Sequence, residues 1–577
     1  MTRNGGWRLR MGCLLAALQI FALTVDTARA AELPRKPNIL LIVADDLGYT
    51  DLGEFGSEIR TPNLDRLARE GLRLVNFHAT PVCSTTRATL LTGTDHHIAG
   101  VGAMYVDQFT RGKPGYEGFL SDRVSTLPEL LRLAGYQTYM AGKWHLGSGP
   151  KQLPVARGFD RSFALLDGAA SHWAKAWFTG PTPTANYRDG QAEVVDLPPD
   201  FYSTSHFTQR IRSYIDEGLS NNKPFFAYLA LTAPHWPLQA PEEIVDRYRK
   251  TYDQGYDVLR AKRIRSAIEK GVLPRSTSAA PARLVATARP WAELGVDDRR
   301  ASSRRMEIYA AMVDVMDREI GGLLGDLQKS GELANTIVIF MSDNGAEGYS
   351  REDQAVARSN PAFKQIDNSE ENFGRQGSLL SYGPGWAAAS SAVFRLFKEF
   401  PTEGGTRVPA LIWDGRNKAD GSIRNQFLTA ADITPTILDF AGSLSSYGRF
   451  VDGSPLPVQG RSFTKLLQDP GAEIRERGSI TASELHGHRA VHMDNWKILW
   501  LGAERGGELG AYRAENRWSL YDLKRDPAET NDLAVREPRV VRELAQAWED
   551  FARKVGVVAV PVTEPPVSSR VSGRKRP

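Results

Sequence analysis

A thiol, a guanidinium group and a short helix-forming run lie together at residues 81–93. Cys83 precedes the run, and Arg87 lies one helical turn further on, so its side chain can fold back over the thiol. Gly93 can close the run as a C-terminal cap. The start of a short helix offers free N–H groups and a positive dipole end. These groups could bind a tetrahedral oxyanion ester. The alternative is a buried structural cysteine, which burial statistics alone favour.

Two pairs of oxygen-bearing side chains could bind a cation. Asp45 and Asp46 follow one apolar run, and Asp343 and Asn344 follow another. Parallel sheets place ligands at the carboxyl ends of such strands. Adjacent carboxylates repel one another, so their joint ionisation favours a cation between them. Hard oxygen ligands without histidine or thiolate favour Ca²⁺ or Mg²⁺ over zinc. A solvated acidic loop is the common alternative.

Basic side chains also follow apolar runs. Lys143 and His145 alternate by two, so on an extended chain they face the same side and could hold an anion and move a proton. By itself a Lys-x-His pair is weakly specific. His235 follows a further apolar run. His172 lies in loop-like sequence, where we expect a surface position. The pattern does not rank three histidines that could touch substrate, which are His96, His97 and His172.

The order and spacing of these motifs resemble the type I, formylglycine-dependent sulfatases, with the bacterial arylsulfatases the most similar branch. Residues 83–93 are similar to the activation signature Cys-x-Pro-x-Arg followed by Leu-Thr-Gly, with Thr85 in place of the usual proline. Residues 142–147, Gly-Lys-Trp-His-Leu-Gly, are similar to a second motif of that family, and His235 matches its Pro-His histidine. The resemblance covers about residues 36–560.

The resemblance implies that a formylglycine-generating enzyme oxidises Cys83 to Cα-formylglycine, whose hydrate is the nucleophile. It implies one bound Ca²⁺, with Mg²⁺ possible, and metal ligands at Asp45, Asp46, Cys83, Asp343 and Asn344. The implied catalytic residues are Cys83, Arg87, Lys143, His145, His235 and Lys398, of which Lys143, His235 and Lys398 contact the substrate.

Two proton transfers are also implied by the resemblance. Lys398 stands five residues before Glu403, as the family's catalytic lysine stands before its Glu-Gly-Gly. His235, with Lys398, would protonate the departing alcohol. His145 would take a proton from the second hydroxyl of the hydrate. We interpret Glu403 and Arg407 as structural.

Apolar strands must bring these residues to one edge of a sheet. Continuous β-branched and aliphatic runs predict buried strands, and helical spacing predicts helices that pack on the sheet. The strands are expected at 37–44, 136–140, 225–231, 336–341 and 408–413, and helices near 61–72, 126–133, 304–327 and 432–440. The resemblance implies an α/β fold: an alkaline-phosphatase-like mixed sheet sandwiched by helices, plus a smaller C-terminal domain with a four-stranded antiparallel sheet and a helix.

The domain boundaries follow changes in composition. We expect a catalytic domain over 36–469, in which the charged, Pro/Ala-rich residues 240–305 form an insertion, and loops over 347–391. A C-terminal α+β domain is expected over 470–558, with strands at 492–501 and 518–522 and a helix over 538–555. The Pro/Ser-rich, basic residues 559–577 predict a disordered tail.

Residues 1–30 predict a secretory signal peptide, with an arginine-bearing start, an apolar core over 14–25 and Ala28-Arg29-Ala30 as the cleavage site. The core is short for a membrane span. We therefore expect export, to a periplasm or the medium, and no stable membrane insertion after cleavage. Cleavage would remove Cys13 and leave Cys83 as the sole cysteine, so no intramolecular disulfide is expected.

Composition excludes some classes of function. The chain has 577 residues, 41% of them hydrophobic and 24% charged, which is typical of a soluble enzyme. Its net charge is +4, most of which lies in residues 1–30. The nearly neutral remainder gives no reason to expect nucleic acid as a partner.

We expect hydrolysis of small-molecule sulfate esters, most simply aryl sulfates, to an alcohol or phenol and inorganic sulfate. Three alternatives stay open. The first is a phosphonate or phosphate ester hydrolase of the same superfamily. The second is a non-catalytic exported binding protein with Cys83 unmodified, which Thr85 favours. The third is a cysteine hydrolase that pairs Cys83 with His145 or His235, which the neighbouring carboxylates disfavour.

Overall fold

The computed structural model describes residues 35–106, 108–176, 184–277, 288–350, 352, 366–417, 419–443, 459–502 and 515–559. Three predicted segments lie wholly or partly outside these residues. They are the signal peptide, the tail apart from its first residue, and residues 278–287 of the insertion.

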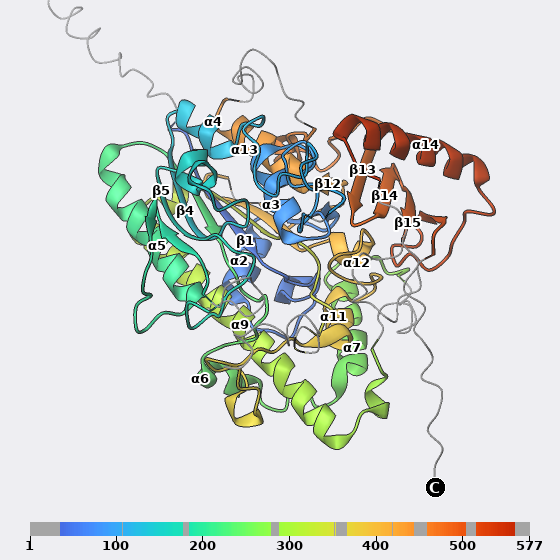
Figure 1. The fold of residues 1–577 in the computed structure, drawn as a ribbon, viewed down its shortest axis with the longest axis horizontal. Helices are drawn as coiled ribbons and strands as arrows, with labels where there is room; N and C mark the ends of the chain where they lie inside the picture. Colours follow the sequence, from blue (N-terminus) through green and yellow to red (C-terminus); the bar gives the residue numbers. More distant parts are fainter. Residues whose placement is uncertain are drawn as a thin grey trace, which may run out of the picture. The chain divides into compact units, whose positions relative to one another are not determined.

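A ten-stranded mixed sheet forms the centre of the larger, N-terminal part of the described chain, in the order β11-β2-β10-β9-β1-β8-β4-β5-β6-β7. Figure 1 labels β1, β4 and β5 of this sheet. Strands β9, β1, β8, β4 and β5 run parallel, and β10 pairs antiparallel with β9. The strands are β1 (Asn38–Ala44), β2 (Leu72–Leu74), β4 (Gln137–Lys143), β5 (Arg161–Leu165), β6 (Tyr187–Asp189), β7 (Ala192–Glu193), β8 (Phe225–Ala230), β9 (Thr336–Ser342), β10 (Ala410–Asp414) and β11 (Ile423–Arg424). A separate two-stranded parallel pair joins β3 (Phe77–His78) and β12 (Leu428–Thr429).

Helices cover both faces of the sheet. Leu40 and Ile42 of β1 belong to one hydrophobic cluster, and Ile39, Leu41 and Val43 belong to another, because successive strand residues point to opposite faces. The first cluster includes α2 (Pro62–Glu70), α5 (Ser203–Gly218) and α9 (Val296–Lys329), and the second includes α3 (Cys83–Thr92), α4 (Leu127–Leu133) and α13 (Ile433–Phe440). This burial on both sides explains the continuous apolar runs and confirms the predicted sandwich.

Some predicted segments differ from the structure. The helix predicted over 304–327 begins at Val296, with Asp297 and Asp298 in its first turn, where the helix dipole favours acidic residues. The predicted insertion contains α6 (Glu242–Val245) and α7 (Gly255–Glu269), and α7 packs on α11 (Gly383–Ser391), which lies where we predicted loops. The short helix α12 spans Glu403–Thr406. Short 3₁₀ turns occur at Gly53–Phe55, Pro150–Gln152, Pro154–Arg157, Leu219–Asn221, Asp246–Tyr248, Trp291–Glu293, Leu333–Asn335, Glu370–Asn372, Ala430–Asp432 and Thr464–Leu467.

The C-terminal part forms the predicted four-stranded antiparallel sheet, in the order β13-β14-β15-β16. Figure 1 labels β13, β14 and β15, beside helix α14. The strands are β13 (Ile480–Leu485), β14 (His488–Met493), β15 (Trp496–Trp500) and β16 (Trp518–Asp522). The strand predicted over 492–501 is therefore two strands, because the chain reverses at Asp494, whose φ is 53°. Helix α14 (Pro538–Val555) packs on this sheet through Leu544 and Trp548. Among the described helices, none is both long and apolar enough for a membrane span.

Candidate active site

The predicted catalytic and metal-binding residues meet at one edge of the large sheet. Parallel pairing aligns Ala44 of β1 with Ser342 of β9, and Ala230 of β8 with both Val43 and Gly142. The polar residues that follow these strands therefore emerge side by side at the carboxyl ends of the strands, as expected for an α/β sheet.

The four predicted oxygen ligands are buried, each at most 1% exposed. Asp46 adopts a left-handed turn (φ 67°), its amide donates to Asp343 Oδ1 at 3.4 Å, and Asn344 Nδ2 donates to Asp46 Oδ1 at 2.7 Å. Asp45 Oδ1 and Asn344 Oδ1 are buried and have no hydrogen-bond partner in the described structure. Unpaired buried acceptors are costly, and a hard divalent cation would satisfy both.

The charges around these oxygens also fit a cation. One ligand atom each from Asp45, Cys83 and Asp343 lies within 4.8 Å of the others. Burial, together with Asp343, raises the pKa of Asp45 to about 7. Lys143 Nζ donates to Asp45 Oδ2 at 2.7 Å, and Arg87 donates to Asp343 Oδ2 at 2.7 and 2.9 Å. A divalent cation would hold all the carboxylates in their charged form.

Cys83 is the first residue of α3 and is 1% exposed. Burial raises the pKa of its thiol, although Lys143 and Lys398 oppose this, so the thiol is protonated at neutral pH. A protonated thiol is a poor nucleophile, which disfavours the cysteine hydrolase alternative. The Thr85 hydroxyl donates to the Val82 carbonyl at 3.0 Å, so the fold accommodates the departure from the proline signature.

His145 approaches Cys83 by a route that differs from our prediction. Strand β4 ends at Lys143, and His145 has a left-handed backbone (φ 56°), so extended alternation does not apply. Its Nδ1 lies 3.4 Å from Cys83 Sγ. Gly168 leaves little room beside the ring, because a Cβ there would lie 2.7 Å from His145 Cε1. Burial and the nearby Lys143 lower the pKa of His145 well below 6.5, so its neutral ring can accept a proton.

His235 and Lys398 meet at Asp46. His235 Nδ1 contacts the Trp236 carbonyl at 2.6 Å, which makes Nδ1 the donor and directs Nε2 toward Asp46 Oδ2, 3.5 Å away. Burial and Lys398 lower the pKa of His235 well below 6.5. Lys398 Nζ lies 2.9 Å from Asp46 Oδ1. Burial disfavours its charge, but Asp46 and Glu347 outweigh burial and raise the pKa of Lys398 well above 10.5.

The prediction of a surface position for His172 was wrong. His172 is 1% exposed, its Nε2 donates to the His235 carbonyl at 3.0 Å, and its Nδ1 accepts from the Ser203 hydroxyl at 2.7 Å. Burial lowers the pKa of His172 to about 4. His172 therefore supports the backbone that carries His235. The sequence contains no local signal for this contact, because the two residues are far apart along the chain.

His96 and His97 lie in a different environment. His97 Nδ1 contacts Asp95 Oδ1 at 2.8 Å, and its Nε2 contacts Glu484 Oε2 of the C-terminal sheet at 3.2 Å. His96 Nδ1 donates to the Val101 carbonyl at 2.9 Å. His97 thus takes part in a buried contact with the C-terminal sheet, and His96 lies beside it.

Glu403 has the structural role that we predicted. Its carboxylate contacts His78 Nε2 at 3.1 Å, Arg407 Nη1 at 3.4 Å and Lys497 Nζ at 2.8 Å. Lys497 also contacts Glu529 at 2.7 Å. This buried network joins the loop that follows Lys398 to the C-terminal sheet.

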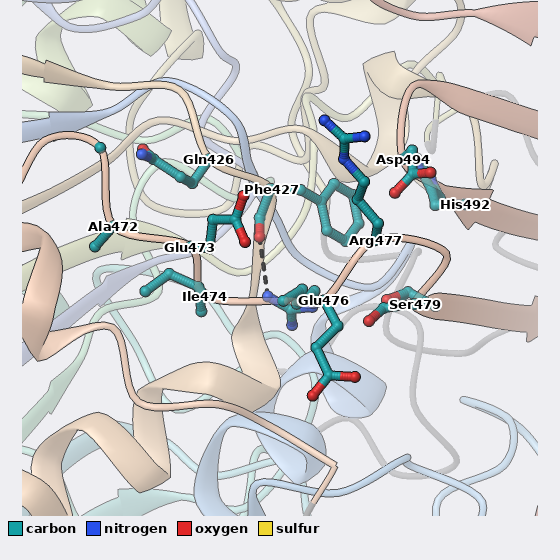
Figure 2. A pocket seen from close by; sticks show the side chains of 13 residues that line it. Gln426, Phe427, Ala472, Glu473, Ile474, Glu476, Arg477, Ser479, His492 and Asp494 are labelled. Atoms are coloured by element: carbon teal, nitrogen blue, oxygen red, sulfur yellow. Dashed lines mark hydrogen bonds between the residues drawn. The ribbon is translucent and has the colours of Figure 1, made fainter.

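A pocket of about 240 Å³ lies away from the predicted site residues, none of which lines it (Figure 2). Phe427 and residues 471–477 form much of its wall, His492 comes from β14, and Asp494 comes from the turn that follows β14. Arg475 donates to the Phe427 carbonyl and to Asp432, so its charge is already paired within the protein. The pocket adds no group to the candidate active site.

Comparisons with known proteins show that the chain is similar to sulfatases. A family model described as sulfatase matches residues 37–443. An uncharacterized sulfatase of Schizosaccharomyces pombe is 41% identical over 538 residues, which is 91% of this chain and 95% of that protein. An arylsulfatase of Klebsiella aerogenes is 39% identical over 72% of this chain and 88% of its own length. The solved structure of Ps i-CgsB, at 22% identity, covers 90% of this chain and 93% of its own, with a TM-score of 0.61.

Proposed function

The chain belongs to the sulfatase family, whose members hydrolyse sulfate esters, and on that premise we propose that it is an exported arylsulfatase with a Cα-formylglycine formed from Cys83. The observation that carries this proposal is the buried group of Asp45, Cys83 and Asp343 at the strand ends. It lies against Lys143 and His145, which are cationic and proton-accepting groups respectively.

The metal would be Ca²⁺, with Mg²⁺ possible, held by Asp45, Asp46, Asp343 and Asn344 beside the side chain of residue 83. The two unpaired oxygens, Asp45 Oδ1 and Asn344 Oδ1, support this assignment. The bound cation would supply positive charge to the sulfate oxygens, and the hydrated aldehyde would supply the nucleophilic oxygen.

The protein's own groups then have defined tasks. Lys143 and Arg87 hold Asp45 and Asp343 in place and add positive charge where the sulfate oxygens would lie. His145, neutral and 3.4 Å from Cys83 Sγ, accepts a proton from the substituent at residue 83. His235 Nε2 and Lys398 Nζ, which both lie beside Asp46, serve the leaving oxygen, to which a proton must pass.

An apolar cluster beside His235, one of the two residues that serve the leaving oxygen, supports a preference for aryl esters. Trp236 follows His235 directly and packs with Ala169 and Leu379. The His235 and Trp236 ring centroids are 4.9 Å apart. An apolar wall next to His235 suits an aromatic leaving group. The name of the similar Klebsiella aerogenes protein, arylsulfatase, points the same way.

Three measurements test the proposal, on residue 83, on ester turnover and on the mature N-terminus. In protein purified from its native host, the tryptic peptide containing Cys83 is expected to be lighter by the thiol-to-aldehyde difference and to react with a hydrazide. The same protein should turn over 4-nitrophenyl sulfate faster than the corresponding phosphate and phosphonate esters. An unmodified thiol that binds sulfate esters without turnover would favour the binding-protein alternative, and faster phosphate turnover would favour a phosphatase. A mature N-terminus just after Ala30 would support export.

A further inference from the structure

Glu347 is a buried carboxylate at the edge of the active site, and the mechanism above gives it no task. It follows the end of β9 by five residues and is 2% exposed. Its Oε2 lies 3.3 Å from Lys398 Nζ, and its Oε1 accepts a hydrogen bond from the Tyr349 amide at 3.0 Å. The hydrogen bond from the Tyr349 amide orients the carboxylate, so the local loop conformation fixes its position beside Lys398.

The loops that carry Glu347 and Lys398 are also joined through their backbones. The Lys398 amide donates to the carbonyl of Ala346, the residue before Glu347, at 3.0 Å. Leu396 and Glu399 flank the lysine with positive φ angles of 58° and 78°. Such strained backbone persists only where the surrounding structure imposes it. The conformations of the two loops therefore place Lys398 next to the Glu347 carboxylate.

Lys398 needs a second anionic partner once the metal site is filled. Its other carboxylate contact is Asp46, at 2.9 Å, which we assign as a metal ligand. A cation bound to Asp46 would neutralise much of the charge that attracts the ammonium group. A lysine side chain has several rotatable bonds, so an ammonium with one weakened anchor loses a defined position. Glu347 is then the carboxylate that holds it.

We propose that Glu347 is a positioning residue for Lys398, which keeps the ammonium group directed at the leaving oxygen during ester cleavage. This inference rests on the proposed function. As the nucleophilic oxygen at residue 83 would bond to sulfur, the bond between sulfur and the leaving oxygen would break, its electron pair would stay on the leaving oxygen, and a proton would pass to that oxygen from Lys398 Nζ. Glu347 forms no covalent bond and gives up no proton. Its contribution is the geometry of the transfer.

Leaving groups of different acidity test this role. Glu347→Gln keeps the shape of the side chain and removes its charge. For phenyl sulfate, whose poor leaving group needs the proton, kcat/KM should fall about 10- to 100-fold, mainly through kcat. For 4-nitrophenyl sulfate the fall should be less than about 3-fold, since this leaving group departs with little protonation. Equal falls for the two substrates, or no fall, would overturn the proposal.

A matched control separates positioning from general damage. Glu307 of α9 is also a buried glutamate, 5% exposed, and pairs with Arg304 at 3.0 Å outside the site. Glu307→Gln should change both substrates by the same factor. If Glu347→Gln fails to fold, Glu347→Asp, which keeps the charge but shortens the reach to Nζ, should show the same selective loss with a smaller size. An unselective loss in Glu347→Asp would count against the proposal.

A double-variant cycle shows whether Glu347 acts through Lys398. In a Lys398→Ala background, Glu347→Gln should lower phenyl sulfate turnover by less than about 2-fold further, whereas independent effects would multiply. If the wild-type protein cleaves aryl phosphates and no sulfates, the proposed function fails, and the same series with aryl phosphates still tests Glu347. If it cleaves no ester, both proposals are refuted.

Discussion

His97 should act as a buried cation between two carboxylates, and its contribution to stability should disappear at alkaline pH. The ring is completely buried between Asp95 and Glu484. Burial alone would lower its pKa, but the two carboxylates outweigh burial and raise the pKa from 6.5 to about 9. The contact therefore links the catalytic domain to the C-terminal sheet through a charge that titrates within an accessible pH range.

The size of the effect follows from the pKa of His97. A rise from 6.5 to about 9 corresponds to roughly 3 kcal/mol of folding stability. Because the folded-state pKa lies above the unfolded one, this stability is fully present below pH 6.5 and is lost as the pH rises through about 9. The pKa of Asp95 is lowered to about 2, partly by the same ion pair with His97, so it adds no separate contribution to the free energy of unfolding.

The assay is urea unfolding of the wild type and of His97→Gln at about pH 7 and about pH 9.5. The difference in unfolding free energy between the two proteins should be roughly 2 kcal/mol larger at the lower pH. Groups that titrate in both proteins cancel in this difference. His488→Gln is the matched control: His488 is also buried, and burial lowers its pKa to about 4, so its cost should be the same at both pH values. A pH-independent cost for His97→Gln would refute the reasoning.

Three further predictions concern the active site and the domain contact. Gly168→Ala should lower kcat about 10- to 100-fold with little change in urea stability, because the new Cβ displaces the His145 ring; unchanged kcat would contradict this. Lys497→Met should lower the free energy of unfolding in urea by about 3–5 kcal/mol, because Glu403 and Glu529 lose their buried cation. A decrease below about 1 kcal/mol would contradict this and show that the network rearranges. Removal of divalent cations with EDTA should abolish sulfate ester turnover and lower Tm, and Ca²⁺ or Mg²⁺ should restore both, whereas a Tm indifferent to chelation would argue against the metal site.

Much of the fold could be predicted because its signals are local. A strand buried on both faces needs a continuous apolar run, and β1 and β9 lie where such runs were found. Helix α4 begins as predicted, because Thr126 and Glu129 form a capping box within four residues. Where the local signal was incomplete the prediction failed, as in the single strand expected over 492–501, which is a hairpin.

The sequence by itself determined which residues lie at strand ends, since Asp45, Asp343 and His235 each follow a recognisable strand. It also made Cys83 and Lys398 candidates, the first through the motif around it and the second through its spacing from Glu403. Only the tertiary structure decided which distant side chains meet. His97 with Glu484 and Glu347 with Lys398 are contacts between residues far apart in the chain, and a local pattern carries no information about them. His145 adds a nearer case, since a left-handed turn just beyond β4 replaced the extended geometry assumed from spacing. The physical reason is that hydrophobic periodicity specifies how a segment packs, whereas buried polar pairs depend on where packing brings separate segments together.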